Sequence, residues 1–176
     1  MATYKIDPAH SDVMFKVKHL MISTITGVFK KFDATLGINE EDFSQAKVTF
    51  EADIDSVDTK NEQRDAHLKG EDFFSADKFP KMTFTSVKIE GNGDNEYTVT
   101  GDLTIRDVTK PIELKVEYNG STKDPRGQER MGFEISGKIN RKDFGLKWSA
   151  VTEAGGLVVA DDVKLAMNVE MVKQAA

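Results

Sequence analysis

Apolar and polar residues alternate with a period of two over most of this chain. The segment from Ala46 to Ile54 is the clearest case, because Lys47, Thr49 and Glu51 separate its apolar residues. Successive side chains of a β-strand point to opposite faces of a sheet, so this pattern predicts strands with one buried face. It recurs in the segments 13–17, 32–38, 46–54, 82–84, 97–105, 112–118, 131–139 and 163–171. The sequence therefore predicts an all-β protein with eight strands.

The connections between these strands decide between two architectures, because eight alternating strands can form a sandwich or close into a barrel. Gly91–Asn95 and Asn119-Gly120 are rich in turn residues, and Pro111 begins a strand where a missing N–H is tolerated. Nearly every connection is short enough to join neighbouring strands. We therefore expect one domain over residues 1–176, folded as an extended eight-stranded antiparallel β-barrel.

Two segments interrupt the alternation. Residues 59–70 have the composition of a short helix that ends at Gly70 and is capped by Asp58 or Thr59. Residues 143–156 form a second excursion, helical or looped, and contain the single tryptophan of the chain.

Composition excludes several classes of function. The chain has 24 basic and 30 acidic residues, a net charge of −6, which argues against a surface for nucleic acid. It has no cysteine, so disulfides, thiolate metal sites and cysteine nucleophiles are excluded. The start of the chain lacks a basic segment followed by an apolar run. We expect a cytoplasmic protein as the sequence stands, or a periplasmic or extracellular one if a leader has been removed.

Residues able to carry chemistry are scattered along the chain. His10, His19 and His67 lie in different segments, without the close spacing of a helical zinc site. The adjacent pair Asp161-Asp162 is typical of a solvated surface, because catalytic carboxylates must face each other across a cleft. No serine lies in a nucleophile elbow. The sequence therefore predicts no metal site and no catalytic residues.

The apolar residues are more informative than the polar ones. Phenylalanine occurs 11 times and methionine 7 times, and such side chains give an adaptable wall that suits a flexible apolar guest. Inward-facing residues of a small barrel either fill the lumen or line a cavity. The pattern alone leaves both alternatives open.

Several motifs resemble those of the YceI family of lipid-binding proteins, and they occur in the same order. They are Tyr4–Val13 followed by Phe15–His19, Gly27–Phe29, Arg64–Leu68 with Phe73–Phe84, Gly101–Pro111 and Arg141–Gly145. The resemblance extends from Tyr4 to about Val169. Asp107 departs from the family by replacing a more common glycine, and the segment Ala160–Asp162 differs slightly at the start of the last strand.

This resemblance implies a lipocalin-like barrel that binds a polyisoprenoid, such as the prenyl tail of a quinone or its precursor, or another amphiphile such as a fatty acid. It also implies a homodimer and a protein that needs no other cofactor. We expect the lipid-binding wall to comprise Phe15, Val17, Leu20, Met21, Phe50, Phe84, Leu103, Ile105, Leu114, Phe133 and Met167. His10, His19 or Arg141 are candidates for orienting a head group at the mouth.

Two alternatives remain open from the sequence. A small barrel enzyme acting on a hydrophobic substrate predicts that at least two of the three histidines meet at a cavity beside a carboxylate. A structural or interaction barrel predicts a solid core without a cavity.

Overall fold

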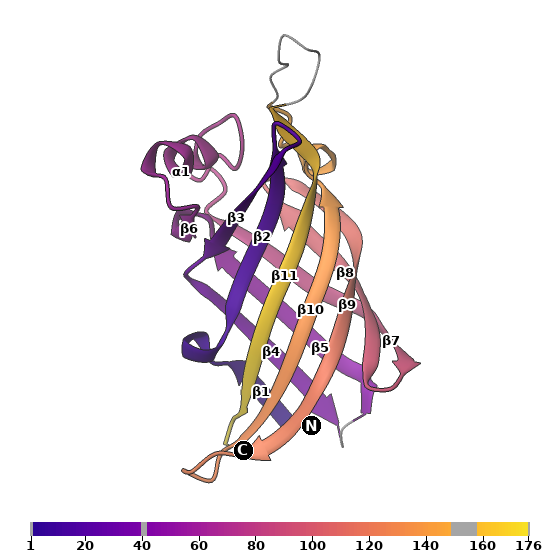
Figure 1. Ribbon diagram of the computed structural model, residues 1–176. Coiled ribbons are helices and arrows are strands. Elements are labelled where there is room, and N and C mark those ends of the chain that lie inside the picture. Colours follow the sequence, from indigo (N-terminus) through magenta and orange to yellow (C-terminus); the bar gives the residue numbers. More distant parts are fainter. Residues whose placement is uncertain (1, 40–41, 149–157, 176) are drawn as a thin grey trace.

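The structure is a computed structural model that describes residues 2–39, 42–148 and 158–175 (Figure 1). Its strands are β1 (Ala2–Ile6), β2 (Asp12–His19), β3 (Ser23–Phe29), β4 (Phe32–Asn39), β5 (Asp42–Asp53), β6 (Val57–Asp58), β7 (Lys81–Gly93), β8 (Glu96–Ile105), β9 (Val108–Lys123), β10 (Glu129–Asn140) and β11 (Val159–Lys173). The α-helix is α1 (Glu62–Lys69), and the 3₁₀ helices are η1 (Pro8–His10), η2 (Ile54–Ser56) and η3 (Arg141–Phe144).

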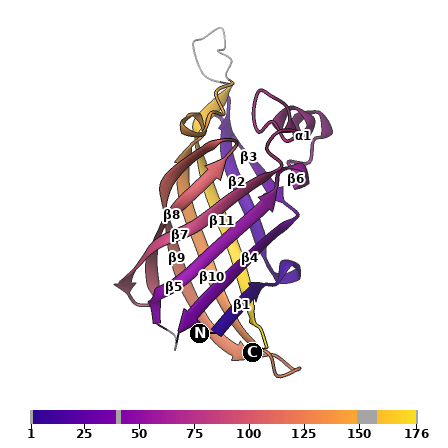
Figure 2. The same ribbon diagram turned by 180° about the vertical axis from the view of Figure 1, so that it is seen from behind.

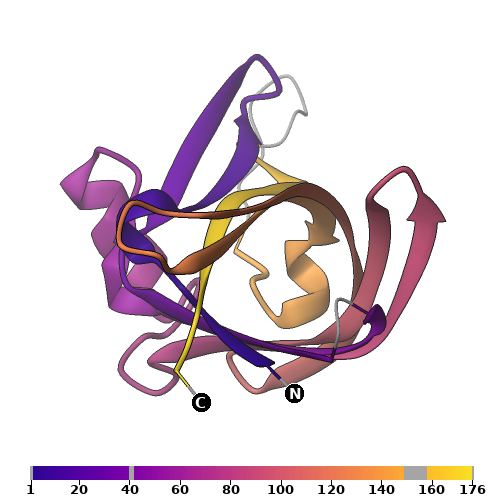
Figure 3. The same ribbon diagram turned by 90° about the horizontal axis from the view of Figure 1, so that it is seen from below.

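The strands form a closed antiparallel ring in the order β1-β4-β5-β7-β8-β9-β10-β11. Closure occurs where β11 pairs back with β1, with Tyr4 opposite Lys173 and Ile6 opposite Met171. The ring is seen end-on in Figure 3. The predicted extended eight-stranded antiparallel barrel with one short helix is therefore confirmed.

Three positions of the ring are occupied by broken strands. Strand β2 pairs with the same edge of β11 as β1 does, above it. Strand β3 then pairs with β2, and β6 pairs with β3, so that these strands extend the sheet beyond the ends of β4 and β5. The eight predicted segments omitted β1, β3 and β6. In β3 the inward positions are Ile25, Gly27 and Phe29, so a glycine interrupts the apolar repeat. A Cβ on Gly27 would overlap the Phe15 ring, which lies over it.

The predicted helix is present as α1, which ends at Gly70 as expected. Its cap is Asn61, whose side chain accepts a hydrogen bond of 2.9 Å from the Arg64 N–H, and is not Asp58 or Thr59. Thr59 instead donates its N–H to Asp65, at 2.9 Å. In Figures 1 and 2, α1 lies beside β6 at the upper end of the barrel.

The second predicted excursion is only partly described. Its beginning forms the last residues of η3, and residues 149–157 lie outside the described ranges. Figure 3 shows η3 inside the ring of strands, where Phe144 and Leu146 are buried. In the part of the chain that the structure describes, no helix is long and apolar enough to cross a bilayer.

Candidate binding cavity

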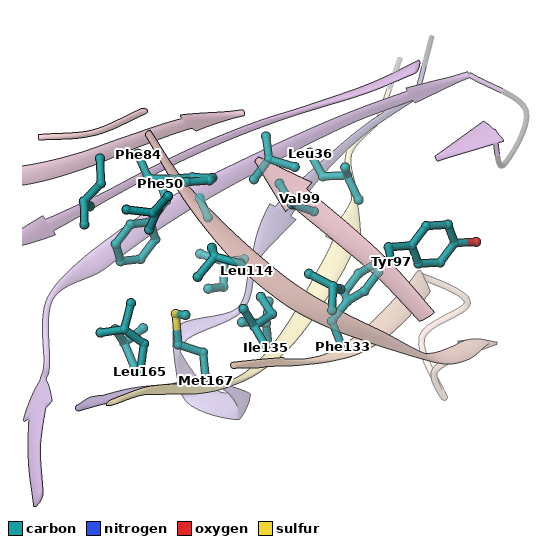
Figure 4. Close-up of a pocket in the computed structure, with 18 of the residues that line it drawn as sticks. Leu36, Phe50, Phe84, Tyr97, Val99, Leu114, Phe133, Ile135, Leu165 and Met167 are labelled. Carbon is teal, nitrogen blue, oxygen red and sulfur yellow. The ribbon is translucent and has the colours of Figure 1, made fainter. Parts of the chain in front are cut away.

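A cavity of about 170 Å³ lies inside the barrel. Every strand of the closed ring contributes to its wall, and β2 and β3 contribute as well. Figure 4 shows side chains from opposite walls, such as Phe84 and Leu165, pointing into the same space. A completely filled lumen, as the structural-barrel alternative requires, is therefore not what the structure contains.

The cavity is elongated. Along β8 its wall extends from Tyr97 to Leu103, and along β11 from Leu165 to Met171. Six residues of strand span about 20 Å, and a strand tilt of about 40° reduces this to about 15 Å along the barrel axis. A cavity of this length and small volume is narrow, which matches an extended chain better than a fused-ring ligand.

The wall of the cavity is almost entirely apolar. Tyr97 is the one described lining residue with a polar side-chain group, and in Figure 4 its hydroxyl points away from the other labelled side chains. No aspartate, glutamate, histidine, lysine or arginine is among the described residues that line the space. The arrangement can bury apolar surface, and it offers no acid–base pair among those residues.

Four aromatic rings gather at the lower end of the barrel. Phe43 lies 5.1 Å from Tyr97, 5.0 Å from Tyr118 and 6.0 Å from Phe133, measured between ring centroids. These rings come from the beginnings of β5, β8 and β10 and from β9. Tilted and edge-on contacts between aromatic rings are favourable, and the four rings together form an apolar wall at this end of the barrel.

Arg141 holds η3 and the residues after it at the upper end. Its guanidinium donates to the carbonyl oxygens of Leu146 at 2.6 Å, Trp148 at 2.7 Å and Ala160 at 2.9 Å. The residue is only 3% exposed, and this burial lowers the pKa of its guanidinium. Because its guanidinium N–H groups donate to backbone carbonyls, Arg141 organises this end of the barrel.

Seven of the predicted wall residues lie around the cavity: Phe15, Phe50, Phe84, Leu103, Leu114, Phe133 and Met167. The other four do not. Leu20 and Met21 form part of an exposed turn between β2 and β3, so the alternation of β2 does not extend to them. Val17 and Ile105 lie toward the upper ends of β2 and β8, and Ile105 packs in the core beyond the cavity.

None of the predicted head-group residues lines the cavity. His10 is exposed in η1, His19 ends β2, and Arg141 is tied to backbone carbonyls as described above. His67 lies on α1, with its ring 5.0 Å from each of Phe73 and Trp148. The meeting of histidines that the enzyme alternative requires is therefore not found at the cavity.

His10 belongs to a network on the outer surface. Its Nδ1 lies 2.7 Å from Asp7 and 3.6 Å from Glu170. Arg130 donates to Asp7 and to Asp124, both at 2.8 Å. His10, Asp7 and Glu170 are close enough together to hold a metal ion, but the Arg130 guanidinium already supplies the positive charge. The network joins η1 to β10, β11 and the turn between β9 and β10.

Replacing Asp7 by asparagine should make stability less dependent on pH in acid. Hydrogen bonds from His10 and Arg130 lower the pKa of Asp7 to about 2, so its stabilisation is present above about pH 4 and disappears as the pH falls through about 2. Because the side chain is partly exposed, we expect Asp7→Asn to lose about 1–2 kcal/mol at about pH 7 and almost nothing near pH 2.

Urea unfolding of both proteins at these two pH values measures the difference. The control is Asp33→Asn, because Asp33 is a half-exposed carboxylate whose ion pair with Lys5 is 3.8 Å long. That change should cost less than about 0.5 kcal/mol at either pH. An equal loss in Asp7→Asn at both pH values would show that the Asp7 carboxylate does not stabilise the fold through its charge.

Comparison with known proteins agrees with the motifs in the sequence. The family model of the YceI-like domain matches residues 4–171. A UPF0312 protein of Staphylococcus epidermidis is 40% identical over 171 residues, covering 97% of both chains. A UPF0312 protein of Staphylococcus aureus is 39% identical with the same coverage.

Solved structures share the barrel. The YCEI protein of Campylobacter jejuni is 39% identical, with a TM-score of 0.77 and 96% of each chain covered. BcnA of Burkholderia cenocepacia is 26% identical, with a TM-score of 0.82 over 94% of this chain and 98% of that chain. A polyisoprenoid binding domain from Saccharophagus degradans has a TM-score of 0.71 over 97% of this chain and 98% of that domain, and its 16% identity shows the fold alone. With a family model covering nearly its whole length and relatives near 40% identity, the chain belongs to the YceI-like family.

Proposed function

We propose that this protein binds a long, uncharged lipid chain inside its barrel, namely a polyisoprenoid such as the prenyl tail of a quinone or a quinone precursor, and carries it. The observation behind the proposal is the elongated cavity with its almost entirely apolar wall. Removing an apolar chain from water contributes about 25 cal/mol for each Å² buried. The apolar wall can bury such a chain along about 15 Å of the barrel axis.

The lack of charge in the wall distinguishes between lipid classes. The carboxylate of a fatty acid costs several kcal/mol to bury unless a cation or hydrogen-bond donors meet it. No lysine or arginine among the described residues lines the cavity. A neutral isoprenoid chain needs no such partner, so the cavity favours it over a fatty acid whose head group enters the barrel.

The volume of the cavity limits what enters without rearrangement. At about 170 Å³ it resembles engineered cavities of about 150 Å³ that accept benzene. A longer chain therefore requires side chains to move. Met14, Met82, Met167 and Met171 all lie in the wall, and unbranched methionine side chains change rotamer readily. We expect the cavity to widen as the ligand enters.

Two comparisons with known proteins support this proposal. The family to which the chain belongs is YceI-like, and the structural neighbour from Saccharophagus degradans is described as a polyisoprenoid binding domain. The enzyme alternative has no comparable support, because the cavity wall contains no ionisable group among the described residues apart from the Tyr97 phenol.

Native mass spectrometry with a series of prenyl alcohols, from geraniol to solanesol, tests the proposal. Fatty acids of matched length serve as controls. Affinity should rise with chain length while each added methylene is buried, by about 0.8 kcal/mol per group at most, and then level off once the chain exceeds the cavity. Each fatty acid should bind more weakly than the alcohol of the same length.

Affinity that does not depend on chain length, or that is greater for the fatty acids, would show that the apolar cavity is not the binding site for a neutral chain. Organic extraction of freshly purified protein then identifies what the barrel carries, since a co-purifying prenyl lipid names the ligand class directly.

A further inference from the structure

The turn between β2 and β3 exposes three consecutive apolar side chains, Leu20, Met21 and Ile22, here called the hairpin tip. Their exposed fractions are 38%, 58% and 82%, and Val87 is the only other large hydrophobic residue in the described ranges that is exposed. Figure 3 shows the β2–β3 hairpin projecting beyond the ring of strands. Isolated apolar residues are common on surfaces, but a contiguous apolar patch on a projecting element marks an interaction site.

The backbone of the hairpin tip makes its composition more unusual. Leu20 and Met21 have φ angles of 53° and 60°, and the Ile22 N–H donates to the His19 carbonyl at 3.1 Å. Turns with two such residues strongly favour Asn-Gly, because most side chains are strained at positive φ. Leucine and methionine are therefore disfavoured in this turn for two reasons: its positive φ angles and the exposure of their apolar side chains to water.

Three exposed lysines lie on the strands behind the hairpin tip. Lys16 and Lys18 are exposed on β2, and Lys164 of β11 is directly opposite Lys16. Strand β3 has no charged residue between Ser23 and Phe29. Like charges on directly opposed residues destabilise a sheet, and within the described ranges no carboxylate lies within 4 Å of these three ammonium groups.

The nearest carboxylates along β11 form ion pairs with other cations. Asp161 lies 3.2 Å from the Lys142 ammonium, and Asp162 lies 3.7 Å from that of Lys138. The surface behind the hairpin tip therefore keeps a local positive charge, although the whole chain carries −6. An exposed apolar tip with lysines behind it is complementary to an anionic bilayer, whose surface attracts lysines and whose interior accepts apolar side chains.

We propose that the hairpin tip inserts into the interfacial region of an anionic lipid bilayer, while Lys16, Lys18 and Lys164 contact the head groups. The hairpin also lines the cavity through Val13, Phe15 and Phe29. Docking through the hairpin tip therefore turns the end of the barrel from which the hairpin projects toward the membrane (Figure 1), where a prenyl lipid resides; this step rests on the function proposed above. The barrel exchanges its ligand with the bilayer from that position.

The sharpest variant is Leu20→Asn combined with Met21→Gly, because it removes the apolar side chains and installs the pair that the turn prefers. It should be as stable as the wild type or more stable, so loss of docking is not a consequence of misfolding. In sedimentation with vesicles of equal parts phosphatidylcholine and phosphatidylglycerol, we expect it to bind at least tenfold more weakly. The matched control is Val87→Ser, which removes an exposed apolar side chain elsewhere and should bind like the wild type.

The electrostatic part has a separate test. Each of Lys16→Gln, Lys18→Gln and Lys164→Gln should weaken binding to these vesicles up to about fivefold, and pure phosphatidylcholine vesicles should bind the wild type poorly. Raising the salt from about 0.1 M to about 1 M should have the same effect as removing the charges. Lys47→Gln, on the exposed face of β5, is the control and should leave binding unchanged.

The proposal is overturned if the wild type does not sediment with anionic vesicles, or if the double variant Leu20→Asn, Met21→Gly sediments as well as the wild type. Uptake of prenyl alcohol from detergent micelles, measured on the same proteins, separates the two proposals. Uptake without vesicle binding leaves the ligand assignment standing and removes membrane docking. Vesicle binding without uptake leaves membrane docking standing and removes the ligand assignment. The hairpin tip is then an anchor for a barrel with another ligand.

Discussion

The Arg141→Met variant is expected to lose about 3–5 kcal/mol of its free energy of unfolding. Methionine fills much of the same space but donates no hydrogen bond, so the carbonyl oxygens of Leu146, Trp148 and Ala160 lose their partner. Each buried acceptor left without a donor costs about 1–3 kcal/mol, and water entering from the end of the barrel recovers part of that. For a chain of this size the loss corresponds to a decrease in Tm of about 10 °C.

Thermal and urea unfolding measure this effect, with two controls. Arg141→Lys keeps the charge but not the planar arrangement of donors, so it should lose an intermediate amount. Arg126→Met removes an exposed arginine from the turn before β10 and should remain within about 0.5 kcal/mol of the wild type. If Arg141→Met is no less stable than Arg126→Met, the guanidinium does not hold η3 in place.

The sequence predicted the barrel because most of its strands are long and alternate cleanly. The segment 97–105 became β8, and 131–139 became most of β10. Alternation alone does not predict that β1 and β2 together occupy one position of the ring, because β1 has only five residues before Pro8. Strand β3 was missed because Gly27 occupies an inward position, and only the structure shows that the Phe15 ring fills the space above it.

The candidate site was partly predictable for a similar reason. Inward positions near the middle of strands, such as Phe84 and Leu114, follow directly from the two-residue period, and they lie in the cavity wall. The period does not place Leu20 and Met21, because the alternating segment ends at residue 17 and two adjacent residues of a strand cannot both face inward; in the structure they form a turn. Nor does it show that Arg141 faces backbone carbonyls, because those partners lie in the segments before and after residues 149–157.

These two errors share a physical origin. A sequence alone does not show whether an apolar residue lines a ligand site or forms a turn. Nor does it show whether an arginine contacts a ligand or the carbonyl groups at a helix end. Backbone geometry distinguishes them: positive φ at Leu20 and Met21 marks the turn, and three short donor–acceptor distances mark the structural role of Arg141. Val99 of β8 also lines the cavity, although it is not among the predicted wall residues.

Replacing Val99 by phenylalanine should abolish most binding of long prenyl alcohols. Val99 lies in the cavity wall near Tyr97 (Figure 4), and the larger ring enters space that the ligand needs. The cavity is only about 170 Å³, so a ring of this size blocks the narrow passage along the barrel axis. We expect affinity for geranylgeraniol, measured by isothermal titration calorimetry, to fall at least tenfold.

Stability should change little in Val99→Phe, because the ring occupies a cavity and is not forced into a filled core; overpacking of a filled core costs about 1–3 kcal/mol. Thr100→Phe is the matched control, since the next residue of a strand faces the opposite side of the sheet, and it should bind the ligand like the wild type. A short alcohol such as geraniol should be affected less than geranylgeraniol, because it needs less of the cavity. If Val99→Phe binds geranylgeraniol as tightly as Thr100→Phe does, the lipid lies outside the barrel, and the apolar cavity is a packing defect without a role in binding.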